Sequence, residues 1–410
     1  MANSGKLSLR SAAARIGAVL LCAALGGFAC GGEAFGRVDA DAMRAGVAAA
    51  LREPKTLART AGLVEILQQL DAANVAGAAA AFDAQLSVLD DEDLRLFLHA
   101  WSAFDPAAAL DHTQAWTMLS KRELGAGQVI YAWARYGAAL EARLNADSLA
   151  EPSVRRVAHA ELVRGWARSG DTDGVTTYVS ELPHGDLRDR YTATLVAALV
   201  ANEGVEGAVR WVESIPDDAH DRFKRTAFRK ALRHVTARDP QAAARWYERH
   251  AATFYADLGM SVVATEWVER DPQATFAWLV AQPAGADRDM GVRFAMNRWL
   301  ALDAPAAEAW MRGNEPVGAL APALEPFAIW LAKRDPAEAV RWSERIPDDT
   351  KRARMLVLTG TRWRRQDAPA FEAWLAEAEL PDAVRRALEG APGATAAGAA
   401  RLAPEEEGGE

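Results

Sequence analysis

Few residues in this chain stand at spacings that could support catalysis. His159 and Glu161 lie two positions apart, and His220 directly precedes Asp221, so each pair could act as general acid and base. Residues one or two positions apart on a helix point in different directions. We therefore expect both pairs to lie on solvated surface. The chain also lacks a Gly-rich phosphate loop, a Gly-x-Ser-x-Gly elbow and a His-Glu-x-x-His zinc pair.

Metal chemistry has equally little support. Asp171, Asp173 and Gly174 have the spacing that opens a calcium loop, but the third acidic position and the closing Glu are missing. Helix capping by Asp171 is the simpler interpretation. The two cysteines, Cys22 and Cys30, are too few for a thiolate metal site. The sequence predicts no catalytic residue, no metal and no cofactor.

One stretch is unusually basic for an acidic protein. Between His220 and His250, nine Lys or Arg residues stand against three acidic ones, while the whole chain has a formal net charge of −9. One interpretation is a solvated helix face balanced by nearby acids such as Glu213, Asp217 and Glu266. The other is a groove that receives an anionic ligand.

The groove hypothesis names six residues at equivalent positions of three successive repeats. They form pairs one helical turn apart: Arg229 and Arg233, Ser261 and Thr265, and Arg293 and Asn297. Equivalent positions of stacked hairpins line one face of the stack. We therefore predict that these six side chains form a polar stripe.

The repeat that positions them is marked by aspartate. Asp239, Asp271, Asp303, Asp335 and Asp367 recur every 32 residues. Looser spacing extends the series toward the N-terminus through Asp71, Asp105, Gly137, Asp171 and Gly204. A fixed period in the thirties is typical of stacked helical hairpins, so we expect about ten of them.

Tryptophan follows the same period. Thirteen of the fourteen indoles fall in two columns, seven residues after the anchor or four to five before it, and only Trp116 stands outside. Each buried indole removes roughly 150–250 Å² from water, so such columns can stabilise a stack. We expect the columns to be core, and Trp116 to be the indole with the best chance of exposure for ligand stacking.

Local chemistry explains the hairpin. In Asp239-Pro240, Asp271-Pro272 and Asp335-Pro336, the aspartate can cap a new helix while proline occupies its first turn. The residue before proline leaves the helical region, which ends the preceding helix. The sequence thus predicts an all-α fold, a right-handed α-solenoid of stacked antiparallel helix pairs.

Over residues 71 to 380 the repeat resembles the tetratricopeptide-type helical-hairpin solenoids. The shared features are the period, Trp in the first helix, Ala followed by an aromatic residue in the second, and a proline after it. This resemblance implies a large surface that binds protein partners. Because the search for catalytic motifs gave none, we expect no enzymatic activity.

The first 29 residues have the layout of a bacterial signal peptide. Lys6, Arg10 and Arg15 precede an apolar run that ends at Cys30. The run resembles a lipoprotein signal, which implies a lipid on Cys30; ordinary cleavage after Ala29 or Gly36 is the alternative. We expect a linker and capping helices over 30–70, the solenoid over 71–389 and a disordered acidic tail over 390–410.

These features favour an exported scaffold or adaptor of the bacterial cell envelope, periplasmic or anchored to the membrane by its lipid. Loss of the signal would take the net charge from −9 to −12, which disfavours nucleic acid as a partner. Two alternatives remain open. One is an α/α-toroid enzyme that acts on glycans, and the other is an envelope protein that binds carbohydrate through exposed Trp.

Overall fold

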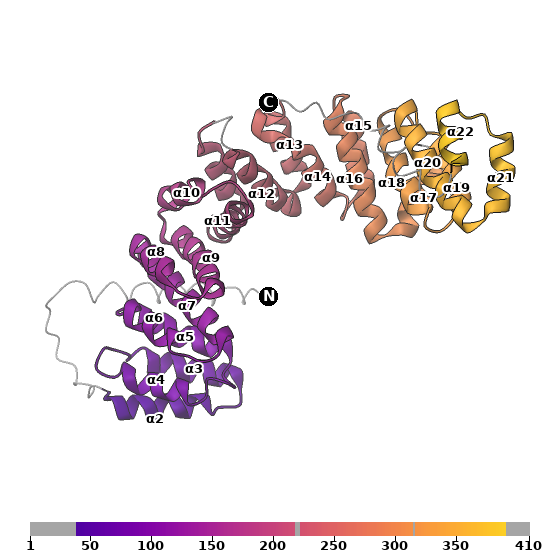
Figure 1. Ribbon diagram of the computed structural model, residues 1–410. Coiled ribbons are helices and arrows are strands. Elements are labelled where there is room, and N and C mark those ends of the chain that lie inside the picture. The colour runs from indigo at the N-terminus through magenta and orange to yellow at the C-terminus, as the bar shows by residue number, and fades with distance from the viewer. Residues whose placement is uncertain (1–37, 218–221, 315, 391–410) are drawn as a thin grey trace, which may run out of the picture. The chain divides into compact units, whose positions relative to one another are not determined.

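The computed structural model describes residues 38–217, 222–314 and 316–390. These ranges form α-helices and two short 3-10 helices and contain no strand, which confirms the predicted all-α class (Figure 1). The chain divides into two compact units, one up to Phe104 and one from Asp105 onward. No helix in the described ranges has the length and apolarity needed to cross a membrane.

The first unit is a small helical bundle. It contains α2 (Ala40–Leu51), α3 (Thr56–Leu67), α4 (Val75–Asp83) and α5 (Asp91–Ser102). Helix α2 packs on α3 and α4, and α3 packs on α5. Gly77 allows the close approach of α4 to α2, because a Cβ there would lie 1.8 Å from the carbonyl oxygen of Ala40. The rings of Phe82 and Phe97 stack 4.4 Å apart in the core.

The second unit contains the remaining helices. Their bounds are α6 Pro106–Gln114, α7 Leu119–Arg135, α8 Ala139–Ser148, α9 Pro152–Ser169, α10 Thr172–Ser180, α11 Asp186–Ser214, α12 Phe223–Arg238, α13 Pro240–His250, η1 Phe254–Ala256, α14 Gly259–Trp267, α15 Pro272–Ala281, α16 Ala286–Leu302, α17 Ala304–Asn314, η2 Gly318–Ala323, α18 Leu324–Leu331, α19 Pro336–Glu344, α20 Asp349–Gln366, α21 Ala368–Glu377 and α22 Asp382–Glu389.

These helices alternate between two layers (Figure 1). The A helices precede an anchor residue and each packs on the next: α7, α9, the first part of α11, α12, α14, α16, α18 and α20. The B helices follow the anchors, and most pack on the A helix of their own repeat and on that of the next, as α13 packs on α12 and α14. Stacked antiparallel helix pairs are the predicted solenoid arrangement.

The anchors lie where the sequence predicts them, between an A and a B helix. In α13, α15 and α19, the aspartate oxygen accepts the backbone N–H of the third helical residue at 2.8–2.9 Å, and Asp171 does the same for Gly174 at 3.0 Å. Capping therefore accounts for Asp171. Gly204 breaks α11 with φ 76°, a left-handed conformation that favours glycine.

Eight of the thirteen column tryptophans are buried in the core, as predicted, and five are only partly buried: Trp278, Trp310, Trp330, Trp363 and Trp374. In the column after the anchor, Trp211, Trp246 and Trp342 are at most 6% exposed. Trp116 corrects the prediction: it is buried at 7% exposed, and its ring lies over Gly125, where a Cβ would approach it to 2.7 Å. Because Gly125 has no side chain, α7 makes room for an indole that stands outside the repeat.

Residues 1–37 and 391–410 lie outside the described residues. The predicted signal peptide, Cys30 and the acidic tail therefore remain predictions.

Candidate functional site

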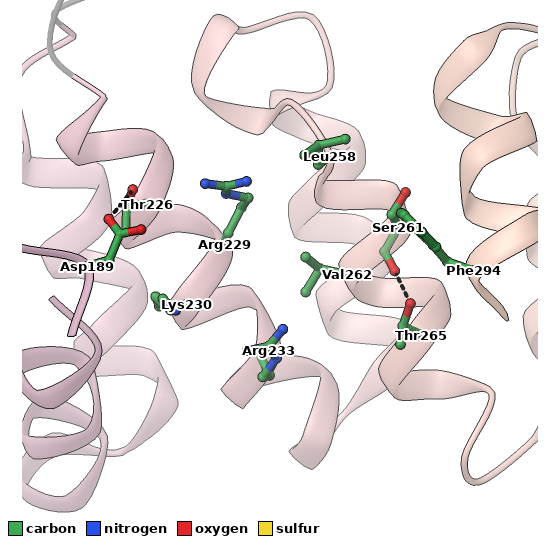
Figure 2. Close-up of a pocket in the computed structure, with 10 residues that line it drawn as sticks. All are labelled: Asp189, Thr226, Arg229, Lys230, Arg233, Leu258, Ser261, Val262, Thr265 and Phe294. Carbon is green, nitrogen blue, oxygen red and sulfur yellow. Dashed lines mark hydrogen bonds between the residues drawn. The ribbon is translucent and has the colours of Figure 1, made fainter. Parts of the chain in front are cut away.

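Part of the predicted polar stripe lines a hollow of about 430 Å³ between α12 and α14, in the second unit. Figure 2 shows Arg229, Lys230 and Arg233 on α12, with Leu258, Val262 and Thr265 on the α14 side of the same hollow. Its wall also includes Asp189 and Thr226 at one end and Phe294 of α16 at the other. Four of the six predicted stripe residues line it: Arg229, Arg233, Ser261 and Thr265.

A second hollow of about 340 Å³ adjoins the first. The two share Asp189, Thr226, Arg229 and Leu258. The second adds three more guanidinium groups, those of Arg188, Arg222 and Arg225. Together the hollows form a groove, which we call the basic groove.

Charge in the basic groove is unbalanced. Six Lys or Arg side chains line it, against the carboxylates of Asp189 and Asp257: Arg188, Arg222, Arg225, Arg229, Lys230 and Arg233. Arg233 binds Glu266 at 2.7 Å and Arg225 binds Asp257 at 3.5 Å, while Arg188 contacts His184 at 3.0 Å and lies over the ring of Phe223. Arg229 and Lys230 form no ion pair within the part of the chain that the structure describes. An anion entering the groove would supply the missing counter-charge.

Apolar side chains also line the first hollow, together with the cations. Val262 of α14 is partly exposed across the hollow from Lys230, and Phe294 is 46% exposed at the α16 end. A groove with both cations and exposed apolar side chains suits a ligand that is acidic and partly apolar. A free inorganic anion would use only part of it.

The start of α14 is a strained point in the groove wall. Leu258 is the only described residue other than glycine with positive φ, at 62°, and it precedes α14 without a side-chain cap. Left-handed backbone costs such a residue roughly 1–2 kcal/mol. Ser261, one turn later, is 5% exposed, and its hydroxyl has no hydrogen-bond partner within the described ranges.

The remaining two stripe residues lie outside the hollow. Arg293 faces α18, where its guanidinium lies 3.7 Å from the carboxylate of Glu325. Asn297 is exposed on α16 and does not line either hollow. The stripe as predicted therefore extends one repeat too far, and Phe294 takes the place that Arg293 was expected to hold. The phenyl ring could have been found from its position, 32 residues after Val262.

Two imidazoles belong to this region: His184 lines the second hollow, and His234 follows Arg233 on α12. Burial, together with the neighbouring Arg233 guanidinium, lowers the pKa of His234, and Glu266 opposes this shift. His234 is therefore neutral at pH 7 and does not add to the positive charge.

His159 differs from its prediction. It is not solvated: its Nδ1 lies 2.9 Å from the Tyr178 hydroxyl, and its Nε2 lies 3.1 Å from the Asp147 carboxylate. Burial is the main cause that lowers the pKa of His159. Glu161 lies beside Arg164 instead. The contacts of His159 join α8, α9 and α10, and no hollow described above reaches it, so a structural role accounts for them. His220 and Asp221 lie outside the described residues.

Within the described residues, no three His, Cys, Asp or Glu side chains cluster in a way that could hold a metal ion. Comparisons of the chain with protein-family models, with curated proteins and with solved structures gave no match. The unpaired cations of the basic groove are suited to binding anions.

Proposed function

We propose that this protein is an exported scaffold or adaptor of the bacterial cell envelope, and that its basic groove binds an acidic segment of a partner protein. The observation that carries the proposal is the pair Arg229 and Lys230, which line the groove without a carboxylate partner in the described part of the chain. The chain carries a net charge of −9, so the attraction of an acidic segment must come from these unpaired cations at close range.

The groove also suits a segment with apolar residues. Val262 and Phe294 offer apolar surface in line with the cations. Apolar contacts give affinity that salt does not screen, while the charges set the orientation and the rate of association. Stacked helical hairpins commonly offer such surfaces to partner proteins.

A synthetic peptide tests the groove directly. The probe is a fluorescent dodecapeptide of alternating Glu and Leu, and its binding to the full mature protein is measured by fluorescence anisotropy. We expect Arg229→Glu combined with Lys230→Glu to weaken binding at least tenfold. The matched control is Arg245→Glu with Arg249→Glu, which makes the same charge change on exposed positions of α13 outside the groove.

Three outcomes would count against the proposal. The groove variant and the control could bind the Glu and Leu peptide equally well, or the unmodified protein could bind a Lys and Leu peptide as tightly. Millimolar inorganic phosphate could also displace the labelled peptide as effectively as unlabelled peptide does. The last would assign the groove to a small anion.

Export and anchoring need a separate test. We expect the protein to fractionate with the cell envelope and to incorporate labelled fatty acid, and Cys30→Ser to abolish the incorporation. Incorporation that persists in Cys30→Ser would remove the lipid anchor from the proposal. An envelope location without incorporation would favour ordinary cleavage after Ala29 or Gly36.

A further inference from the structure

The B helices carry a second site, at the gap between α15 and α17. Neighbouring B helices are usually joined by a polar bridge. The indole N–H of Trp211 donates to Thr176 at 2.8 Å, that of Trp246 to Glu213 at 3.1 Å, and that of Trp278 to Glu248 at 2.8 Å. Further along, Arg312 of α17 binds Glu338 of α19.

This bridge is missing between α15 and α17. Trp310 stands in register with Trp278, but Val280 stands where the preceding repeat has Glu248. Within the described residues, no hydrogen bond or ion pair joins α15 to α17, and the indole N–H of Trp310 has no acceptor. The terminal pair, α19 and α21, also lacks a bridge, but it does not border the hollows described next.

Two hollows open at this gap, with volumes of about 550 and 650 Å³. Both are lined by Trp310, Gln273 and Asn314. These volumes lie within the range of roughly 300–1,000 Å³ that is usual for small-ligand sites. We call the two hollows together the Trp310 groove.

Trp310 is held as a rigid platform. Its ring stacks on Phe276 at 4.7 Å with an interplanar angle of 22°, and Trp299 lies 5.7 Å away. The ring is only partly buried, in contrast to Trp246, which is 2% exposed. An indole that is fixed by its neighbours and partly exposed loses little entropy when a ligand packs against its exposed part.

The polar groups of the groove are mostly neutral, and its three charged side chains sum to a net charge of −1. Gln273 is exposed and makes no side-chain hydrogen bond within the described ranges, and Asn314 uses its amide N–H for the Trp310 carbonyl, which leaves its oxygen free. Arg270 stands with Asp271 and Asp303, whose side chains also cap helices. Planar amide, carboxylate and guanidinium groups bind neighbouring hydroxyls, while an indole packs against C–H groups.

We propose that the Trp310 groove binds a neutral oligosaccharide. The combination of an indole platform, free amides and little net charge fits a polyhydroxylated ligand with apolar ring faces. It does not fit the acidic segment assigned to the basic groove. This site is independent of that proposed function, since it lies on the other helix layer and uses none of the same residues.

The decisive variant is Val280→Glu, which restores the carboxylate that the preceding repeat has at this position. Val280 is 47% exposed, so the change is compatible with folding. The new carboxylate is expected to accept the Trp310 N–H and to close the gap. Isothermal titration calorimetry with neutral gluco- and chito-hexaoses should show binding to the unmodified mature protein and at least a tenfold loss in Val280→Glu.

Two further variants separate binding from folding. Gln273→Ala removes an exposed amide and should weaken binding about fivefold or more, whereas Gln241→Ala, the same position one repeat earlier, should leave it unchanged. Thermal unfolding checks that all three variants remain folded. No binding of any neutral hexaose, unchanged binding in Val280→Glu, or stronger binding of a proline-rich decapeptide than of the hexaoses would overturn the proposal.

Discussion

The indole nitrogen of Trp246 donates a hydrogen bond of 3.1 Å to the carboxylate of Glu213, which belongs to the preceding repeat. The same indole packs against Phe228 of its own repeat, with ring centroids 4.6 Å apart. One side chain thus fills the interior of a hairpin and fastens it to its neighbour. In a stack without a single central core, such contacts decide whether adjacent repeats unfold together.

Removal of this indole should be severe. Trp246 is 2% exposed, and truncation of a buried aromatic residue to alanine typically costs about 3–5 kcal/mol. We expect Trp246→Ala to lower the free energy of unfolding by this amount in urea titrations followed by circular dichroism. The exposed neighbour Arg245, changed to alanine, should alter stability by less than about 0.5 kcal/mol. A loss below about 1 kcal/mol in Trp246→Ala would contradict the role given to the indole.

The aspartate caps are open to a milder test. Asp271 accepts the N–H of Ala274 at 2.9 Å, and loss of such a cap costs about 1 kcal/mol. Asp271→Ala should therefore reduce the free energy of unfolding by about that amount, while Asp271→Asn, which can still cap, should reduce it by a few tenths. Equal effects of the two substitutions would show that the charge of Asp271, and not the hydrogen bond, stabilises α15.

Much of the fold could be predicted because the residues that mark the repeat, aspartate, proline and glycine, act on the backbone next to them. An aspartate before proline acts on the amides of its own helix, so its role can be inferred without knowing which other helix lies nearby. Gly204 is the same case: its position in the period indicates a break, and the structure has one, inside α11.

The two proposed sites were harder to predict because they depend on contacts between repeats. Arg229 and Arg293 look equivalent in the sequence, yet Arg293 lies beside Glu325 while Arg229 has no such partner in the described ranges. Trp310 shows the same limit. Its special position arises from Val280, thirty residues earlier, and from the bridges that neighbouring repeats have there. Periodicity reveals which residues share a position, and side-chain packing decides which of them are left unpaired.

Acidification should destabilise the contact between α8, α9 and α10. Burial lowers the pKa of His159 below its ordinary value of 6.5. As the pH falls, His159 is therefore protonated at a higher pH in the unfolded chain than in the folded protein. Stability is then lost below about pH 6.5, down to the pKa of the folded state. We expect the melting temperature to fall between about pH 7.5 and 5.5, and to fall less in His159→Gln, which cannot titrate.

His234 also has a lowered pKa and remains in that variant, so part of the decline should persist. The reverse result, a steeper decline in His159→Gln than in the unmodified protein, would mean that His159 is protonated more easily in the fold than in the unfolded chain.

Relief of the backbone strain at Leu258 should stabilise the protein. Leu258 has φ 62° and ψ 3°, and asparagine adopts this left-handed conformation far more readily than leucine. We expect Leu258→Asn to raise the free energy of unfolding by about 1 kcal/mol in urea titrations. Leu187→Asn, the same change at a more exposed leucine on the first turn of α11 with ordinary backbone, should give no gain. Leu258 lines both hollows of the basic groove, so the same variant also tests whether its side chain contributes to binding. A gain in stability with weaker binding of the Glu and Leu peptide would show that it does. A loss of stability would show that the packing of the leucine side chain outweighs the backbone strain.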